Sequence, residues 1–259
     1  MIELAGRTAL IPGASGGIGR EVARAFAECG CDLALGYFTR EPEARETLEY
    51  ARGLGRRVRL DRVDTSSYEA AKRWVDDVLA EYGHIDILAS CVGAHLPQGF
   101  SLFTRQDPAS WHKIIDGQLM SFIYLCRPLA EHMMERKAGR IIALASDGGK
   151  VGESGLAVAN AGNAGVIGFA KSLARELGRH GITVNVVCPG PIQGPTLDKV
   201  RSEGDTGTKL VEEMIRRVPM KRLGTARDIA AAMAFLASAD AAFITGQAIS
   251  VSGGLVMNR

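Results

Sequence analysis

The segment from Gly139 to Gly178 constrains the fold of this chain more than any other. It begins with an apolar run, Arg140 to Ala145, of the length of a buried strand. A glycine-rich loop follows, and then a long helical pattern with small residues at helical spacing, namely Ala157, Ala161, Ala164, Gly165 and Gly168. A helix with so many small residues on one side packs closely against a neighbour. The segment therefore predicts a strand, a loop at the strand end where parallel sheets place their chemistry, and a closely packed helix.

The same order of strand, glycine-rich turn and helix opens the chain. Arg7 to Pro12 predicts a buried strand, Gly13 to Gly19 (GASGGIG) a tight turn, and the amphipathic stretch through Glu28 a helix. Further apolar runs alternate with helical stretches: Asp32 to Tyr37, Arg57 to Leu60, Ile85 to Ser90 and Ile182 to Gly190. Alternating strands and helices predict an α/β fold with a parallel sheet covered on both faces. At this length we expect one domain over residues 1–259.

Composition narrows the class of partner. The net charge is +2 and no run rich in Lys or Arg stands out, which argues against nucleic acid or a membrane surface as the main partner. No apolar run is long enough to span a bilayer, and the N-terminus enters a strand within a few residues. Five cysteines without a C-x-x-C pair favour reduced thiols in a cytoplasmic protein. We expect no metal site.

The glycine turn and the Gly139 to Gly178 segment together resemble the short-chain dehydrogenase/reductase family. GASGGIG is similar to that family's Thr-Gly-x-x-x-Gly-Ile-Gly pattern, with Pro12 in place of the Thr. GRII before Ser146, NAGVIGFAKSLARE from Asn163 onward, and the Pro-Gly that ends the strand at Gly190 match as well. The resemblance covers essentially the whole chain. It implies a doubly wound Rossmann-type fold with a seven-stranded parallel sheet and helices on both faces.

The resemblance also implies where a catalytic site belongs. The family places a Ser at the end of the strand, here Ser146, and a Tyr-x-x-x-Lys motif on the next helix. This chain has Ala159 at the Tyr position and Asn163 at the Lys position. Gln118 stands where the family has an Asn that helps to hold a proton-relay water. Ser146 and Gln118 are therefore expected to be remnants of a site that has lost its general acid, a loss typically worth ~10² to 10⁴ in rate.

The cofactor positions that the resemblance implies are better preserved. The glycine turn would hold a pyrophosphate at a helix N-terminus, Asp64 matches the family's adenine-contacting Asp, and Gly93 is the one residue kept from the family's Asn-Asn-Ala-Gly. The expected cofactor-binding residues are Gly13, Ser15, Gly17, Ile18, Gly19, Asp64, Gly93, Pro189 and Gly190. These residues are equally compatible with binding of NAD or NADP and with the loss of any cofactor.

Other positions weaken the cofactor assignment. Pro12 removes a backbone donor, and Gly194 stands where the family has a Thr that meets the nicotinamide carboxamide. Tyr37 occupies the place of the ribose-binding acid, which weakens the case for NAD. Arg40 lies close enough in sequence to meet a 2′-phosphate, but Gly16 stands where many NADP-using relatives carry an Arg, and an isolated Arg in a loop is more often a solvated surface residue. Asp64 precedes a helix and is equally well explained as a turn or capping residue. The choice between NAD and NADP therefore stays open.

Two functional hypotheses follow from this pattern. The first is a catalytically silent subunit that forms a tetramer with an active paralogue and stabilises it, through two long helices expected at about Pro108 to Lys137 and Ser154 to Arg179. The active partner would be an NAD(P)-dependent hydroxyacyl-CoA dehydrogenase. The family includes a dehydrogenase for 2-[hydroxy(phenyl)methyl]succinyl-CoA that combines an active and an inactive member, and this chain resembles the inactive member.

The second hypothesis is an atypical NAD(P)H-dependent ketoreductase with another proton donor. Asp147 and Lys150 directly follow Ser146, and the further candidates are Glu153, His95 and Tyr124. A water held by Gln118 and Asn163 would be another route for the proton. A weaker third reading is a protein that senses a ligand with the retained pocket. The segments expected to select a substrate are the loop from Pro97 to Asp107 and a lid from Pro195 to about Arg217.

Overall fold

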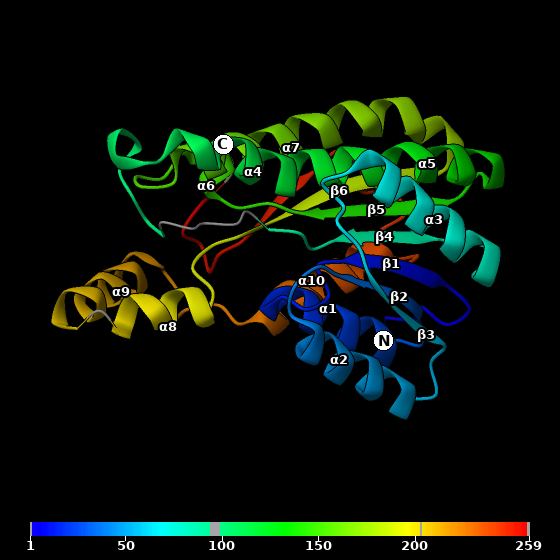
Figure 1. Ribbon diagram of the computed structural model, residues 1–259, viewed down its shortest axis with the longest axis horizontal. Coiled ribbons are helices and arrows are strands. Elements are labelled where there is room, and N and C mark those ends of the chain that lie inside the picture. Colours follow the sequence, from blue (N-terminus) through cyan, green and yellow to red (C-terminus); the bar gives the residue numbers. More distant parts are fainter. Residues whose placement is uncertain (1, 94–98, 203, 258–259) are drawn as a thin grey trace.

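Seven parallel strands form one sheet at the centre of the computed structural model, which describes residues 2–93, 99–202 and 204–257. The strand order is β3-β2-β1-β4-β5-β6-β7 (Figure 1). The chain winds outward from β1 in one direction and from β4 in the other, so the topological switch lies between these two strands. The predicted doubly wound, seven-stranded parallel sheet is confirmed, and ligands of such sheets bind beyond the carboxyl ends of the strands at the switch.

The strands are short, and those in the middle of the sheet are buried on both faces. Their bounds are β1 Thr8–Pro12, β2 Asp32–Tyr37, β3 Val58–Arg62, β4 Ile87–Ser90, β5 Gly139–Leu144, β6 Ile182–Pro189 and β7 Ala248–Val251. Along β1, Ala9 and Ile11 pack into one apolar core, and Leu10 packs into the other. Helices on both faces explain why the strand sequences are continuous apolar runs rather than alternating ones.

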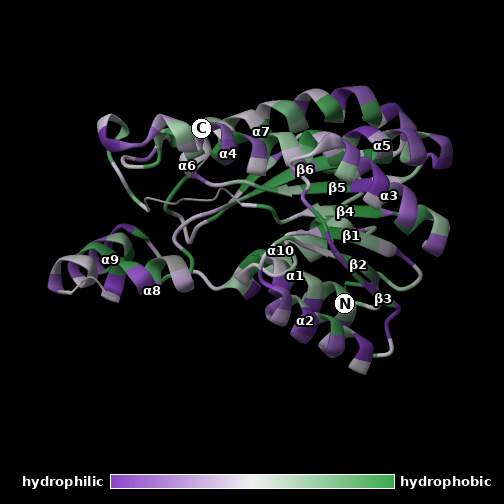
Figure 2. Ribbon diagram, viewed as in Figure 1, coloured by the Kyte–Doolittle hydropathy of each residue, from purple (hydrophilic) through white to green (hydrophobic). Residues whose placement is uncertain are grey.

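Two layers of helices enclose the sheet (Figure 1). One layer contains α1 (Gly17–Glu28), α2 (Glu41–Gly53) and α10 (Ala226–Ala237). The opposite layer contains α3 (Tyr68–Tyr82), α5 (Ser121–Arg136) and α7 (Ala157–Leu177). Figure 2 shows apolar strands between helices whose polar residues lie mainly on the outside, as expected for amphipathic helices on a buried sheet.

The long helix expected from Pro108 to Lys137 is wrong as a single element. A 3-10 turn (Pro108–Ser110) leads into α4 (Trp111–Ile115), and a π-helical segment (Asp116–Met120) then separates α4 from α5. The hydroxyl of Ser121 donates to the carbonyl oxygen of Asp116 at 3.2 Å, which satisfies one acceptor of the widened turn. Such π segments are common at functional sites, and this one carries Gln118.

Four further details differ from the interpretation of the sequence. The glycine-rich loop after β5 contains a short helix, α6 (Gly148–Val151), and α7 begins at Ala157 rather than at Ser154. Part of the loop expected from Pro97 to Asp107 lies outside the described residues, and a 3-10 turn (Phe103–Arg105) lies within the rest. A second 3-10 turn (Gly178–His180) follows α7.

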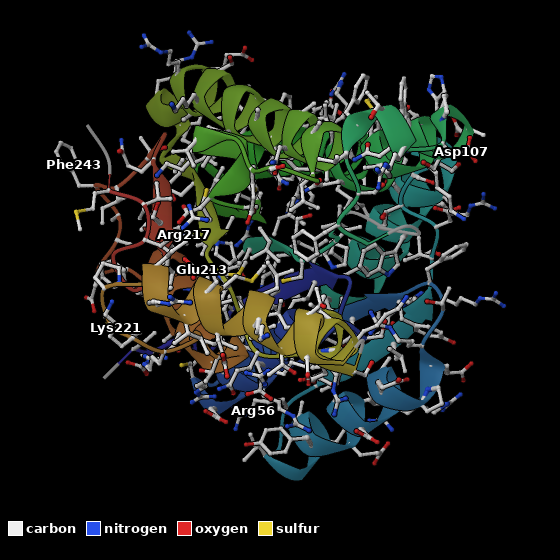
Figure 3. All side chains as sticks on the ribbon, turned by 90° about the vertical axis from the view of Figure 1, so that its left-hand side faces the viewer. Arg56, Asp107, Glu213, Arg217, Lys221 and Phe243 are labelled. Carbon is white, nitrogen blue, oxygen red and sulfur yellow. The ribbon has the colours of Figure 1, made fainter. Side chains whose placement is uncertain are left out.

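The expected lid consists of two helices, α8 (Pro195–Ser202) and α9 (Asp205–Arg217), which project from the body on the left of Figure 1. Leu197, Val200 and Val211 form a small apolar cluster between them, against which Phe100 packs. A bridge between Ile192 and Gly224 joins the two ends of the lid at its base. Figure 3 looks onto this side, with the two helices in front.

No helix among the described residues is both long enough and apolar enough to cross a membrane.

The contact between Gly36 and Trp74 gives a test of the packing around β2. A Cβ atom on Gly36 would lie 2.6 Å from the Trp74 ring, which is held in place because its indole nitrogen donates to Asp61 at 2.8 Å. We expect Gly36→Ala to lower the free energy of unfolding by about 1–3 kcal/mol, measured by urea titration. Gly53→Ala, at the end of α2 with open space around the new methyl group, is the matched control. Equal effects of the two substitutions would contradict this packing.

The buried thiols give a test of the core at alkaline pH. All five cysteines are free, and burial raises the pKa of Cys91 and of Cys188 to about 12. An unfolded thiol has a pKa of about 8.5, so the unfolded chain loses these protons first as the pH rises. The contribution of these buried thiols to the free energy of unfolding is therefore fully present below about pH 8.5. It is lost as the pH rises, so we expect the urea midpoint to fall between about pH 8.5 and 12. The fall should be shallower for Cys91→Ala, and a flat profile would contradict the burial of these thiols.

Candidate functional site

A cleft of about 1010 Å³ opens over the carboxyl ends of the strands. All of the site residues expected from the sequence line it. They are Gly13, Ser15, Gly17, Ile18, Gly19, Asp64, Gly93, Gln118, Ser146, Ala159, Asn163, Pro189 and Gly190. The fold thus brings together residues from both halves of the chain, although the roles assigned to them stay predictions.

The glycine turn after β1 forms one end of the cleft. Gly13 has a φ of +80°, and a Cβ atom on Gly19 would lie 2.2 Å from the carbonyl oxygen of Gly13, so the turn requires glycine at both positions. Gly17, by contrast, borders open space. No side chain caps α1, whose first turn lines the cleft. This arrangement suits a phosphate group at the helix N-terminus.

The next part of the cleft lies beyond β2 and β3. Tyr37, Phe38 and Arg40 line it, and the Phe38 side chain is 50% exposed. Asp64 also lines it, and its Oδ1 accepts hydrogen bonds from the backbone nitrogen and the hydroxyl of Ser66, at 3.0 and 2.6 Å. Asp64 is therefore a turn residue at the cleft edge, while Ser67 caps α3.

The end of the cleft where the resemblance predicts the catalytic residues lies at the tip of β5. Ser146 is half-buried, and its hydroxyl oxygen accepts a hydrogen bond from the backbone nitrogen of Gly148 at 3.2 Å. Ala159 lies in the first turn of α7 with only 5% of its surface exposed. A methyl group therefore borders the cleft where the family has a phenol.

Two hydrogen bonds connect Gln118, Asn163 and Ala159 in a chain. The Asn163 amide nitrogen donates to the carbonyl oxygen of Ala159 at 2.9 Å, and the Gln118 amide nitrogen donates to Oδ1 of Asn163 at 2.5 Å. Because the Ala159 carbonyl only accepts, it fixes the orientation of the Asn163 amide, which in turn fixes that of Gln118. Both amides are more than nine-tenths buried. Their neutral groups thus bond to each other, and the two positions supply neither an ammonium group nor an acid.

The side chains of Asp147 and Lys150 contact β7 rather than the cleft. The buried Asp147 carboxylate accepts a hydrogen bond from the Ser250 hydroxyl at 2.6 Å. Lys150 donates to the same hydroxyl at 2.8 Å and to the carbonyl oxygen of Ala248 at 3.1 Å. Neither residue lines the cleft. Both side chains are engaged with β7, which argues against either one as a replacement for the missing acid.

The remaining candidate proton donors that the structure describes do not line the cleft either. Glu153 is exposed between α6 and α7, and Tyr124 packs edge-to-face on Tyr68 with ring centres 5.6 Å apart; neither lines the cleft. His95 lies outside the described residues. Among the residues that the structure describes, no group of three or more His, Cys, Asp or Glu side chains is arranged to hold a metal ion.

Sequence analysis missed one wall of the cleft. Ala109, His112, Lys113 and Asp116 line it from α4 and its flanks. Their i, i+3, i+4, i+7 spacing marks one helical face, but the sequence gives no sign that the helix breaks after Ile115 and presents this face. Asn160, next to Ala159, also lines the cleft.

Comparisons with known proteins agree with this geometry. A family model described as Enoyl-(Acyl carrier protein) reductase matches residues 13–256. The chain is 39% identical over 257 residues to Nodulation protein G of Rhizobium sp. (strain N33), covering 99% of this chain and 100% of that one. The chain belongs to the short-chain dehydrogenase/reductase family.

Two further family members match this chain over nearly the full length of both proteins. The 3-oxoacyl-[acyl-carrier-protein] reductase FabG of Escherichia coli (strain K12) is 38% identical over 252 residues, which is 97% of this chain and 98% of that protein. The solved structure described as the crystal structure of gox2181 superposes with a TM-score of 0.90 at 28% identity, covering 98% and 97% of the two chains. Fold and strand order are therefore those of the family, although residues 159 and 163 depart from its catalytic motif.

The amide chain predicts a measurable loss when it is broken. Gln118→Ala leaves the buried Oδ1 of Asn163 without its donor, and a buried unsatisfied acceptor costs about 1–3 kcal/mol. We expect a decrease of that size in the free energy of unfolding from urea titration. Gln247→Ala, which removes an exposed amide, is the matched control and should change stability by less than about 0.5 kcal/mol. Equal stability of the two variants would show that the buried amides do not depend on each other.

Proposed function

We propose that this chain is a catalytically silent short-chain dehydrogenase/reductase subunit that assembles with an active paralogue and stabilises it. The amide chain supports this proposal most directly. Carbonyl reduction requires a proton donor and a group that stabilises the developing alkoxide. Here the two positions hold a methyl group and an amide, and that amide is bonded to the Ala159 carbonyl and to Gln118.

The surroundings of Ser146 support the same conclusion. Its hydroxyl oxygen already accepts a hydrogen bond from the backbone nitrogen of Gly148, and a hydroxyl is a poor acid. The charged residues that follow it in the sequence are engaged with Ser250 and Ala248. An atypical ketoreductase would therefore need a donor supplied by the substrate, by water or by another side chain of the cleft, and His112, Lys113 and Asp116 are the titratable residues that line it from α4 and its flanks.

Two surfaces support an assembly. The outward face of α7 carries the exposed small residues Ala161, Ala164 and Gly168, which would let a second helix approach closely. A second group of exposed apolar side chains lies near the end of the chain, with Phe243 fully exposed and Met220 and Met257 65% and 72% exposed. Phe243 lies at the outer edge of the molecule in Figure 3. Exposed apolar side chains of this size are common where subunits meet.

The names of the relatives support a substrate class for the proposed partner. Several are named 3-oxoacyl-[acyl-carrier-protein] reductases, which act on acyl thioesters. We therefore propose that the active partner is an NAD(P)-dependent hydroxyacyl-CoA dehydrogenase, and that the most specific candidate for the assembly is a 2-[hydroxy(phenyl)methyl]succinyl-CoA dehydrogenase.

The test is purification of the chain, with an affinity tag, from its native cells. We expect a paralogue with intact Tyr and Lys to co-purify in a constant ratio and the complex to oxidise hydroxyacyl-CoA. Ser146→Ala in this chain should leave the turnover of the complex unchanged, whereas loss of the partner's catalytic Tyr should reduce it by at least about 10²-fold. A chain that purifies alone, or a complex inactivated by Ser146→Ala, would contradict the proposal.

A further inference from the structure

We propose that the end of the cleft at the tip of β5 binds the hydroxyl group of a hydroxyacyl thioester and discriminates against the corresponding oxoacyl thioester. The inference deepens the proposed function and rests on it for the thioester class, since a silent subunit retains its ligand without converting it. The preference for a hydroxyl rests on two buried oxygen atoms of residues that line the cleft, Oε1 of Gln118 and Oδ1 of Asn160.

Both oxygens belong to buried side chains and lack a hydrogen-bond donor. Gln118 and Asn160 line the cleft and are only 4% and 8% exposed. Within the part of the chain that the structure describes, neither oxygen accepts a hydrogen bond. A buried acceptor without a donor costs free energy, so such atoms are unusual in folded proteins and call for a ligand group or a water molecule.

The bonds of the two amide nitrogens show that the free atoms are acceptors. The Asn160 nitrogen donates to the backbone carbonyl oxygen of Glu153 at 3.4 Å, which leaves Oδ1 free. The Gln118 nitrogen donates to Oδ1 of Asn163, whose own nitrogen donates to the Ala159 carbonyl, and this leaves Oε1 free. Turning either amide over would place one oxygen against another, so both free atoms are oxygens.

The two oxygens lie at the same end of the cleft. Asn160 and Asn163 are three residues apart on α7 and therefore share a helix face, and Gln118 is bonded to Asn163. A Cβ atom on Gly148 would collide with Oδ1 of Asn160, and the Gly148 nitrogen donates to the hydroxyl oxygen of Ser146. Oδ1 of Asn160 thus contacts the loop that follows β5, in which Ser146 lines the cleft.

These polar groups favour a hydrogen-bond donor in the ligand. A ligand hydroxyl beside Ser146 would donate to Oδ1 of Asn160, and its own oxygen would accept from the Ser146 hydroxyl. Oε1 of Gln118 would accept from a second donor, such as an ordered water. A ketone in the same place accepts only and leaves both oxygens unpaired. Sites with buried polar groups reject ligands that leave those groups without a partner.

The side chains around these oxygens suit the carbon chain of an acyl group. The methyl group of Ala159 lies next to Asn160 in the sequence and borders the cleft, and Leu156 and Ile192 also line it. The hydroxyacyl thioester of the proposed partner carries a hydroxyl on such an apolar chain. Its oxidised form differs only in the group that would face the two oxygens, so the site would distinguish the two forms of one compound.

The experiment is isothermal titration calorimetry of the purified full chain without a nicotinamide cofactor. The ligands are both enantiomers of 3-hydroxybutyryl-CoA, acetoacetyl-CoA and butyryl-CoA, which differ only at carbon 3 of the acyl group. We expect one hydroxy enantiomer to bind at least about tenfold more tightly than acetoacetyl-CoA and butyryl-CoA. Because the coenzyme is common to all of them, its own contacts cancel in the comparison.

Asn160→Leu tests the assignment of the acceptor. The substitution removes Oδ1 with little change in side-chain size, and we expect the preference for the hydroxy compound to fall below about threefold. Asn160→Ala removes the same oxygen without adding volume and should give the same loss. Gln247→Leu is the matched control, because it removes an exposed amide that does not line the cleft. Circular dichroism checks that the variants are folded.

Three results would overturn the hydroxyl site. They are no binding of any of these ligands at millimolar concentration, binding of the hydroxy and oxo compounds within about threefold of each other by the unchanged chain, and an equal preference in the Asn160→Leu and Gln247→Leu variants. None of these results bears on the proposed assembly with a paralogue, which is tested by co-purification and by turnover of the complex.

Discussion

The hydrogen bond from the Asn163 amide to the carbonyl oxygen of Ala159 determines what this cleft is able to do. That carbonyl belongs to the backbone of α7 and accepts only, so the Asn163 nitrogen faces it and Oδ1 faces the opposite way. Gln118, presented by the π-helical turn, completes the chain with its own amide nitrogen. The longer side chain of Gln118 meets the shorter side chain of Asn163 directly. A position that holds a relay water in the family is thereby replaced by a direct contact between two neutral groups.

The two ends of the cleft present different polar groups. At the glycine turn, the uncapped first turn of α1 and the Arg40 side chain line the cleft. At the tip of β5, Asn163 and Gln118 are bonded to each other, and Asp147 and Lys150 are engaged with β7. If the proposed loss of chemistry at the tip of β5 holds, it does not require loss of binding at the glycine turn. A subunit with this cleft would respond to a ligand without transforming it.

Much of the fold and of the cleft lining was predictable, because these features depend on local sequence pattern. The apolar runs and the GASGGIG turn predicted the parallel sheet, and counting from Ser146 placed Ala159 and Asn163 at the cleft. The π-helical turn at Asp116–Met120 was not predictable, since it arises from packing rather than from a break in the sequence pattern. The direction of Asp147 and Lys150 was equally hidden. It depends on Ser250, about a hundred residues later in the sequence, which only the sheet brings alongside.

The most direct test of the account is a single-turnover measurement on the purified chain alone, mixed with stoichiometric NADPH or NADH and a 3-oxoacyl thioester. Nicotinamide absorbance reports hydride transfer even if it occurs once. With no general acid over the substrate, the account predicts no transfer above the rate of the buffer without protein. Transfer at a rate within about 10²-fold of an intact family member would show that another group supplies the proton, and would contradict the account.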